Sequence, residues 1–308
     1  MIACFDIGGS AIRGAVARAV SDIRPVGSVP TPVHDFDAFA EAVAELLARC
    51  GIAPGAPMAL SITGVVDPAS ETIKVANIPG LDGRRLGPDL ATRLGRPVLV
   101  ANDADCFALA EAVAGAGAGR RIVFGAILGT GVGGGLVVDG RLVRGAGGFA
   151  GEWGHGPILA TRVGTPPADL PRLPCGCGQA GCVDTLGGAR GLERLHRHLH
   201  GDSRTSREIT AAWIAGASDA ARTIDVWTDL VADPLALVVN VVGADIVPVG
   251  GGLATVRPLV ERLDAAVRAR ILRDTDAAIV VPAACRYEPG LLGAAILALR
   301  ETGDARAA

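Results

Sequence analysis

Three cysteines lie within the eight residues CGCGQAGC, and glycines surround them. They are Cys175, Cys177 and Cys182. Thiolates are soft ligands that zinc favours, and a structural zinc site is tetrahedral with four protein ligands. In a reducing compartment, cysteines stay reduced or bind metal rather than forming disulfides. The cluster therefore predicts three ligands of a zinc site, with reduced thiols in a glycine-rich loop as the alternative.

The fourth ligand of such a site has few candidates, because the chain has only five histidines. His34 lies in a predicted N-terminal loop, and His155 lies between predicted strands and the cysteines. His196, His198 and His200 lie in LHRHLH, on a predicted surface helix. His196 and His200 are four residues apart and could chelate a metal, but we interpret this helix face as a solvated basic surface.

Glycine-rich turns follow three predicted strands, at residues 5–10, 127–135 and 247–253. The second contains five glycines between Gly129 and Gly135. Such turns can present backbone N–H groups to an anion. Turn geometry alone explains any single one of them, whereas the set of three favours phosphate binding.

The only lysine of the chain, Lys74, lies in ETIKVAN, away from every glycine turn. A P-loop nucleotide-binding site places a lysine on the β- and γ-phosphates within G-x-x-x-x-G-K-[ST]. If this protein binds a nucleotide, it does so without that lysine.

Asn102 and Asp103 end an apolar strand predicted over RPVLVAND, and a predicted helix follows them. Either side chain is suited to the N-cap of that helix. A helix N-terminus also favours the charged form of a carboxylate. Capping is the simplest role for Asp103, and a general base facing a cleft is the functional alternative. Asp105 is expected in the first turn of the helix.

The elements that position these residues alternate between strands and helices. Residues 2–19 and 122–145 each predict a strand, a glycine turn and a second strand. Further strands are predicted within residues 57–66, 96–103, 244–254 and 277–285, and helices within 37–50, 104–116, 192–200, 218–243, 257–272 and 290–301. Residues from about 147 to 190 are expected to be rich in loops. This alternation indicates an α/β fold.

Length and composition limit the class of protein. A chain of 308 residues suits two medium lobes or one large domain, and half of its residues are hydrophobic. Its formal net charge of −3 lacks the excess of basic residues that is typical of nucleic-acid-binding proteins. We find neither a signal peptide at the start nor 18 uninterrupted apolar residues. We therefore expect a cytoplasmic protein that binds neither nucleic acid nor membrane, in which Cys4, Cys50, Cys106 and Cys285 are small buried residues.

The motifs taken together resemble the ROK family of sugar kinases and sugar-responsive repressors. They are DIGGS, ANDADCFALAEA, LGTGVGGGLVVDG, GFAGEWGH, CGCGQAGC and VPVGGGLA, in family order over nearly the whole chain. Within the family, the motifs and the 19 residues between His155 and Cys175 are most similar to those of bacterial N-acetylglucosamine kinases. The resemblance implies the two-lobed actin-like ATPase (ribonuclease-H-like) α/β fold, with a zinc-stabilised loop in the larger lobe. We predict a smaller lobe of residues 1–115 plus 290–308, and a larger lobe of residues 116–289.

The resemblance also implies the roles of individual residues. His155 is the implied fourth zinc ligand beside the three cysteines, and Asp103 is the implied catalytic base. The implied sugar-binding residues are Gly64, Asn77, Asn102, Asp103, Glu152, His155 and Asp184. The implied ATP- and Mg²⁺-binding residues are Asp6, Gly8, Gly9, Ser10, Gly129, Thr130, Gly131, Gly250, Gly251 and Gly252. Glu152 lies three residues before His155, so a zinc ion that holds His155 also positions Glu152.

One of these positions departs from the family, which usually has glutamate where this chain has Asp184. Aspartate is shorter by one methylene group, and the position normally helps to bind the sugar near its anomeric carbon and C2. The substitution therefore puts the identity of the sugar in doubt, though not the class of reaction.

The activity implied is the ATP- and Mg²⁺-dependent phosphorylation of a sugar at its 6-hydroxyl, with N-acetylglucosamine as the first candidate. A glucokinase and an N-acetylmannosamine kinase are the near alternatives. A sugar-sensing repressor of the family needs a DNA-binding module ahead of DIGGS, and we expect none because the aspartate of that motif is residue 6. Family members commonly form dimers or tetramers, so a homodimer or higher homo-oligomer is expected.

Overall fold

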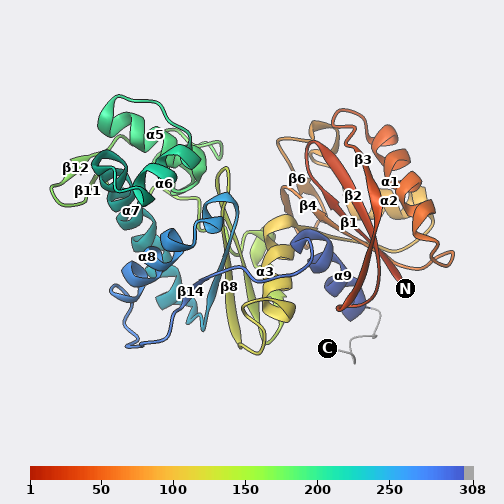
Figure 1. Cartoon of the computed structure of the whole chain (residues 1–308). Coiled ribbons are helices and arrows are strands. Elements are labelled where there is room, and N and C mark those ends of the chain that lie inside the picture. The colour runs from red at the N-terminus through yellow and green to blue at the C-terminus, as the bar shows by residue number, and fades with distance from the viewer. Residues whose placement is uncertain (302–308) are drawn as a thin grey trace. The chain divides into compact units, whose positions relative to one another are not determined.

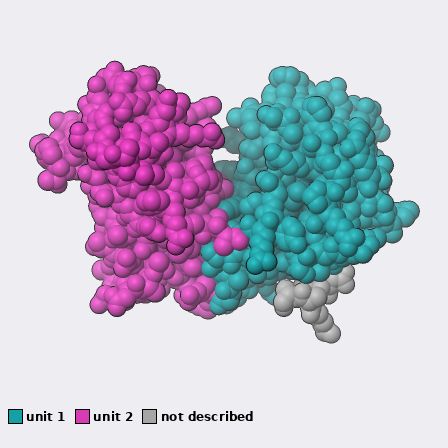
Figure 2. Space-filling view, in the orientation of Figure 1, with its two compact units in different colours: residues 1–119, 135–150, 285–308 teal, residues 120–134, 151–284 magenta. Residues whose placement is uncertain are grey.

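The computed structural model describes residues 1–301, which fold into two compact units (Figures 1 and 2). Unit 1 comprises residues 1–119, 135–150 and those from 285 onward, and unit 2 comprises residues 120–134 and 151–284. The predicted lobe boundaries at 115 and 290 lie within five residues of two of these boundaries.

Besides residues 116–119 and 285–289 at its ends, the predicted larger lobe includes one internal segment, residues 135–150, that belongs to unit 1. The reason is close packing at Gly135. A Cβ at this residue would lie 2.9 Å from both the Ala104 carbonyl oxygen and the Ala108 Cβ. Residues 302–308 of the predicted smaller lobe lie outside the described residues.

A five-stranded sheet in the order β3-β2-β1-β4-β7 forms the centre of unit 1. Its strands are β1 (Ile2–Ile7), β2 (Ala11–Ala19), β3 (Asp22–Pro30), β4 (Met58–Ile62) and β7 (Val98–Asn102). β1, β2 and β3 pair antiparallel, whereas β1, β4 and β7 run parallel. Every residue of β4 is buried, as expected for a central parallel strand that is covered on both faces.

The helices of unit 1 cover both faces of this sheet (Figure 1). They are α1 (Phe36–Cys50), α2 (Leu86–Leu94), α3 (Asp103–Ala114) and α9 (Pro289–Glu301). α1 and α2 lie on one face, and α9 packs on the other face together with α3. α1 begins where the Asp35 side chain accepts hydrogen bonds from two backbone N–H groups, and it ends at Gly51 in the left-handed conformation. Short elements complete the unit: β5 (Val65–Val66), β6 (Ile73–Lys74), η1 (Pro79–Leu81), β10 (Arg141–Val143) and η2 (Ala146–Gly148).

The second five-stranded sheet has the order β10-β9-β8-β13-β14. Its other strands are β8 (Ile122–Leu128), β9 (Val132–Val138), β13 (Val247–Gly250) and β14 (Val280–Pro282). In chain order, this sheet repeats the arrangement of the first one: third, second, first, fourth and fifth strand. Unit 2 contains β8, β13 and β14 of this sheet. Its other elements are α4 (Asp184–Gly187), α5 (Ala189–His200), α6 (Ser206–Ile214), α7 (Ser218–Val242), α8 (Arg257–Arg268), β11 (Arg162–Val163), β12 (Ala168–Asp169) and η3 (Gly252–Thr255).

The α/β prediction and all six predicted helices are confirmed, but β3, α2 and α6 were not predicted. α6 begins with a capping box in which Thr205 and Glu208 satisfy each other's backbone N–H groups. No helix within residues 1–301 is long and apolar enough to cross a membrane.

The prediction that this face of LHRHLH is solvated is wrong for His196. This side chain is fully buried, and its Nδ1 lies 2.8 Å from the Thr223 hydroxyl of α7. Burial lowers the pKa of His196. The sequence reading failed because α5 packs against α7 through this face.

The scattered cysteines behave largely as predicted. Cys4, Cys50 and Cys106 are buried, and Cys285 is half-buried. Burial raises the pKa of the Cys4 and Cys285 thiols to about 12, so both are protonated and unreactive at neutral pH.

Candidate functional site

In unit 1, the predicted site residues gather where three parallel strands end. Ile7, Ile62 and Asn102 are register partners across β1, β4 and β7, so the residues that follow them lie along one edge. Asp6 lies next to this edge and accepts hydrogen bonds from Ser61 (3.0 Å) and Arg13 (3.2 Å). Its carboxylate is thus held in one orientation by two donors.

Asn102 is the N-cap of α3. Its Oδ1 accepts from the Ala104 N–H at 2.7 Å, and its Nδ2 donates to the Gly64 carbonyl oxygen at 2.7 Å. Gly64 has a φ of 101°, and a Cβ there would lie 2.5 Å from the Lys74 carbonyl oxygen. Only glycine fits this position. The Asn102 amide group connects the Gly64 carbonyl to the first turn of α3.

Asp103 is the first residue of α3 and is exposed. One carboxylate oxygen accepts from the Ala104 N–H at 2.9 Å, within the same turn. Asp105 is buried instead, with 6% of its surface exposed. Of the carboxylates in the first turn of α3, Asp103 is therefore the one that solvent or a substrate reaches.

The first glycine turn follows β1 and lies beside Asn77. A Cβ at Gly9 would lie 3.3 Å from the Asn77 Nδ2. Asn77 and Ser10 are both exposed. The first glycine turn, Asn77 and the end of β7 therefore all belong to unit 1, on elements of one sheet and its loops.

In unit 2, the second and third glycine turns lie against each other. The second (Gly129–Gly131) follows β8, and the third (Gly250–Gly252) follows β13, which runs parallel to β8. A Cβ at Gly251, whose φ is 89°, would lie 2.5 Å from the Leu128 carbonyl group. The two turns need glycine in order to approach this closely.

The three clustered cysteines and His155 come together as predicted. Their ligand atoms all lie within 4.8 Å of one another. His155 Nδ1 lies 3.6 Å from Cys175 Sγ, and the sulfurs of Cys177 and Cys182 are also 3.6 Å apart. In a tetrahedron with Zn–S bonds of about 2.3 Å, the ligand atoms stand about 3.7 Å apart. The donor set and these two distances fit zinc.

The other ring nitrogen of His155 faces Glu152. Its Nε2 lies 3.6 Å from the Glu152 carboxylate. Burial raises the pKa of Glu152, the charge of Asp184 adds to this increase, and His155 opposes it. The neighbouring Trp153 donates its indole N–H to the Gly133 carbonyl oxygen of β9 at 2.8 Å, which fixes the loop that carries both residues.

Asp184 connects the cysteine cluster to the second glycine turn. Its Oδ1 accepts from the Val132 N–H at 2.8 Å, and its Oδ2 lies 3.9 Å from Cys175 Sγ. A Cβ at Gly131 would lie 2.2 Å from the same Oδ1. One carboxylate oxygen of Asp184 is therefore occupied by a hydrogen bond from the residue that follows the turn.

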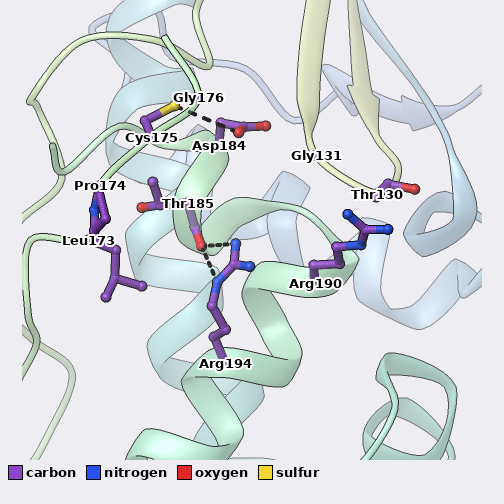
Figure 3. Close-up of a pocket in the computed structure, with 10 residues that line it drawn as sticks. All are labelled: Thr130, Gly131, Leu173, Pro174, Cys175, Gly176, Asp184, Thr185, Arg190 and Arg194. Atoms are coloured by element: carbon purple, nitrogen blue, oxygen red, sulfur yellow. Dashed lines mark hydrogen bonds between the residues drawn. The ribbon is translucent and has the colours of Figure 1, made fainter. Parts of the chain in front are cut away.

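A cavity of about 580 Å³ opens in unit 2 between this turn, the cysteine loop and α5 (Figure 3). Its lining residues are Thr130, Gly131, Leu173, Pro174, Cys175, Gly176, Asp184, Thr185, Arg190 and Arg194. Neither arginine was predicted as a site residue: Arg190 lies before the helix predicted from residue 192, and Arg194 lies within that helix. The sequence feature that could have indicated Arg190 is its place directly after a glycine-containing stretch, in a chain with a single lysine.

The model of the ROK family matches residues 2–301 of the chain. This chain belongs to the ROK family. It is 34% identical over 299 residues to an N-acetyl-D-glucosamine kinase of Salmonella gallinarum, covering 96% of this chain and 99% of the relative. A match of this extent places it among the sugar kinases of the family.

Two solved structures resemble the chain along its length. A ROK hexokinase from Thermus thermophilus is 32% identical, with a TM-score of 0.84 and coverage of 98% of this chain and 99% of that one. A ROK glucokinase from Streptomyces griseus, in complex with glucose and AMPPNP, is 26% identical, with a TM-score of 0.76 and coverage of 97% and 99%.

Proposed function

We propose that this ROK-family enzyme transfers the γ-phosphoryl group of ATP to the 6-hydroxyl of N-acetylglucosamine. The observation that carries the proposal is an exposed carboxylate, Asp103, at the end of three parallel strands, in a chain that matches an N-acetyl-D-glucosamine kinase over 96% of its length. The actin-like fold is part of this proposal, and the repeated strand order of the two sheets supports it.

Asp103 is the proposed general base. Phosphoryl transfer requires little covalent chemistry from the protein, which must position the reactants, stabilise charge and accept the proton of the attacking hydroxyl. Asp103 fits the last task because it is exposed and held at the start of a buried helix. Asp6, fixed by Ser61 and Arg13, is the proposed residue that orients Mg²⁺.

The three glycine turns are the proposed nucleotide site. Gly8, Gly9, Ser10, Gly129, Thr130 and Gly131 are assigned to the phosphates, and Gly250, Gly251 and Gly252 to the adenosine. Backbone N–H groups bind phosphate without a lysine, which suits a chain that has only Lys74. AMPPNP, bound to the Streptomyces griseus glucokinase, is consistent with nucleotide binding in this family.

The proposed sugar ligands are Gly64, Asn77, Asn102, Glu152, His155 and Asp184, together with Asp103. Asp184 is the weakest of these, because one of its oxygens accepts from Val132. If Asp184 does not distinguish the substituents at C2 of the sugar, glucose could also be a substrate. Glucokinase activity is therefore the second candidate, and glucose in the Streptomyces griseus complex supports it. N-acetylmannosamine kinase activity is a further alternative.

His155, Cys175, Cys177 and Cys182 are the proposed ligands of a structural zinc ion. Four protein ligands leave no open position for a reacting water molecule, so the ion supplies rigidity. The Nε2 of a zinc-bound His155 points to Glu152, which is thereby held in place for the sugar. The cytoplasm, which supplies ATP and keeps thiols reduced, is the proposed location, and assembly as a homo-oligomer stays a prediction.

A coupled assay of ADP release tests the proposal. Purified protein with ATP and Mg²⁺ would be offered N-acetylglucosamine, glucose, N-acetylmannosamine and fructose, and the product's phosphate position would be read by ³¹P NMR. We expect the highest kcat/KM with N-acetylglucosamine and a 6-phosphate product. A preference for glucose or N-acetylmannosamine would replace the substrate, and phosphorylation of none of the four sugars would overturn the proposal.

A further inference from the structure

If the proposed function holds, positive charge beside the second glycine turn would strengthen the binding of the nucleotide's phosphates by backbone N–H groups. Lys74 does not supply it, because this exposed residue lines a separate cavity of unit 1 with Asp67 and Asp82. The cations that line the cavity beside Thr130 and Gly131 are two arginines, Arg190 and Arg194.

The start of α5 is attached directly to the second glycine turn. Ala189 donates its backbone N–H to the Gly129 carbonyl oxygen at 2.7 Å, and Arg190 donates to the Thr130 carbonyl oxygen at 3.4 Å. A Cβ at Gly188 would lie 2.7 Å from the Gly131 Cα. The backbone of Arg190 is therefore held within hydrogen-bonding distance of the turn that is proposed to bind phosphate.

The two arginines differ in what their guanidinium groups do. Arg194 donates through Nε and Nη2 to the Thr185 carbonyl oxygen and so connects α5 to α4. The Arg190 guanidinium has no hydrogen-bond or ion-pair partner within the described residues, and the residue is exposed. In Figure 3 its guanidinium extends toward Thr130 at the end of the turn. Arg190 is thus the cation of the cavity that is available to a ligand.

We infer that Arg190 binds the phosphates of the nucleotide at the second glycine turn, where it supplies the cationic contact that lysine provides in P-loop enzymes. A guanidinium presents its N–H donors in a planar fork that matches two phosphate oxygens, and such charge-assisted pairs are strong. The Thr130 hydroxyl lines the same cavity and provides a further donor. A volume of about 580 Å³ lies in the range of small-molecule sites.

Calorimetry with ADP, adenosine and N-acetylglucosamine 6-phosphate tests this role, on the full chain with Mg²⁺ present. The variants are Arg190→Gln, Arg190→Lys and, as matched control, Arg197→Gln. Arg197 lies two turns further along the same helix and is exposed, and its guanidinium also has no ion-pair or hydrogen-bond partner among residues 1–301.

We expect Arg190→Gln to weaken ADP binding about ten- to hundredfold, the effect of losing a hydrogen bond to a charged group. The KM for ATP should rise by a similar factor, while the sugar KM and the affinities for adenosine and the sugar phosphate stay within about twofold. Arg190→Lys should recover part of the ADP affinity because it keeps the charge and loses the fork. Arg197→Gln should behave as the wild type.

Four results would overturn the inference. The first is that Arg190→Gln binds ADP as tightly as the wild type, and the second is that it loses equal affinity for ADP and adenosine, which would indicate a structural role. The third is a loss of affinity for the sugar phosphate alone, and the fourth is an equal loss of ADP affinity in Arg197→Gln. The ADP–adenosine comparison needs no turnover. It therefore reports on Arg190 even if the wild type phosphorylates none of the sugars and the proposed function fails.

Discussion

Asn102 and Asp103 are adjacent, and the structure separates their tasks. Asn102 uses its amide group to cap α3 and to hold the Gly64 carbonyl oxygen. Because Asn102 performs the capping, helix stability does not require the Asp103 carboxylate in that role. The capping explanation of Asp103 is thereby weakened, and the general-base role is the one to test.

Replacing Asp103 by asparagine should reduce kcat by at least about a hundredfold, the lower end of general-base effects. The variant keeps the shape of the side chain and loses proton-accepting capacity, so the sugar KM should change by no more than a few-fold. Steady-state kinetics with the preferred sugar measure both. Asp37→Asn, an exposed change in the first turn of α1, is the control. An Asp103→Asn enzyme with wild-type turnover would remove this residue from catalysis.

Replacing Glu152 by glutamine should raise the sugar KM about tenfold or more. The change removes a charged acceptor of a sugar hydroxyl, and such hydrogen bonds contribute about 1.5–3 kcal/mol. Its ring neighbour His155 keeps its contact with the cysteines, so the metal content should stay at the wild-type value. Glu261→Gln, on the exposed face of α8, is the matched control. A sugar KM equal to that of this control would argue against a sugar contact.

At the scale of elements, one loop system connects the Cys/His cluster to both proposed ligand sites. His155 faces Cys175 with one ring nitrogen and Glu152 with the other. Asp184 follows the last cysteine by two residues and accepts from the N–H of Val132, which directly follows the second glycine turn. Ordering the cysteine loop therefore orders a proposed sugar ligand and a proposed phosphate turn together.

Removing the metal should affect this loop system first. Metal analysis should find about one zinc per chain, and a strong chelator should raise the sugar KM. Alkylation followed by mass spectrometry should then label Cys175, Cys177 and Cys182, while Cys4, Cys50 and Cys106 stay protected by burial. The same labelling of the three loop cysteines before and after chelation would contradict a zinc site.

At the scale of the whole molecule, the chain passes between the two units repeatedly, including after Gly119 and after Ala284. The fully buried Glu111 of α3 binds the chain segments of unit 1 next to both of these crossings. Its carboxylate accepts from the Ala116 N–H and from the Cys285 N–H, each at 2.8 Å. Two segments far apart in the sequence are thus anchored on one side chain.

Glu111→Ala should destabilise the protein by about 3 kcal/mol, because it leaves two partly buried N–H groups without this acceptor. For a unit of this size, the loss corresponds to a decrease in Tm of about 6–12 °C. Differential scanning calorimetry measures it. Glu261→Ala removes an exposed ion pair with Arg257 and should cost less than about 1 kcal/mol. Equal melting temperatures for the two variants would show that Glu111 does not anchor these segments.

Some features followed from the sequence because their causes are local. The local sequence predicted α1, α7 and α9, and α7 continues through Pro234 as one helix. Cysteine spacing predicted three members of the cluster, and family motifs supplied His155. Strand-ending polar residues placed Asn102 and Asp103 at the start of α3.

Other features depended on contacts between segments distant in the sequence, which no local pattern encodes. Burial of His196 results from the packing of α5 against α7. The commitment of Asp184 to Val132, 52 residues away, results from the return of the cysteine loop to β9. Assignment of residues 135–150 to unit 1 results from the contact of Gly135 with α3. The sequence alone determined the chemical groups and their local elements, and tertiary packing decided which of those groups remain free to meet a ligand.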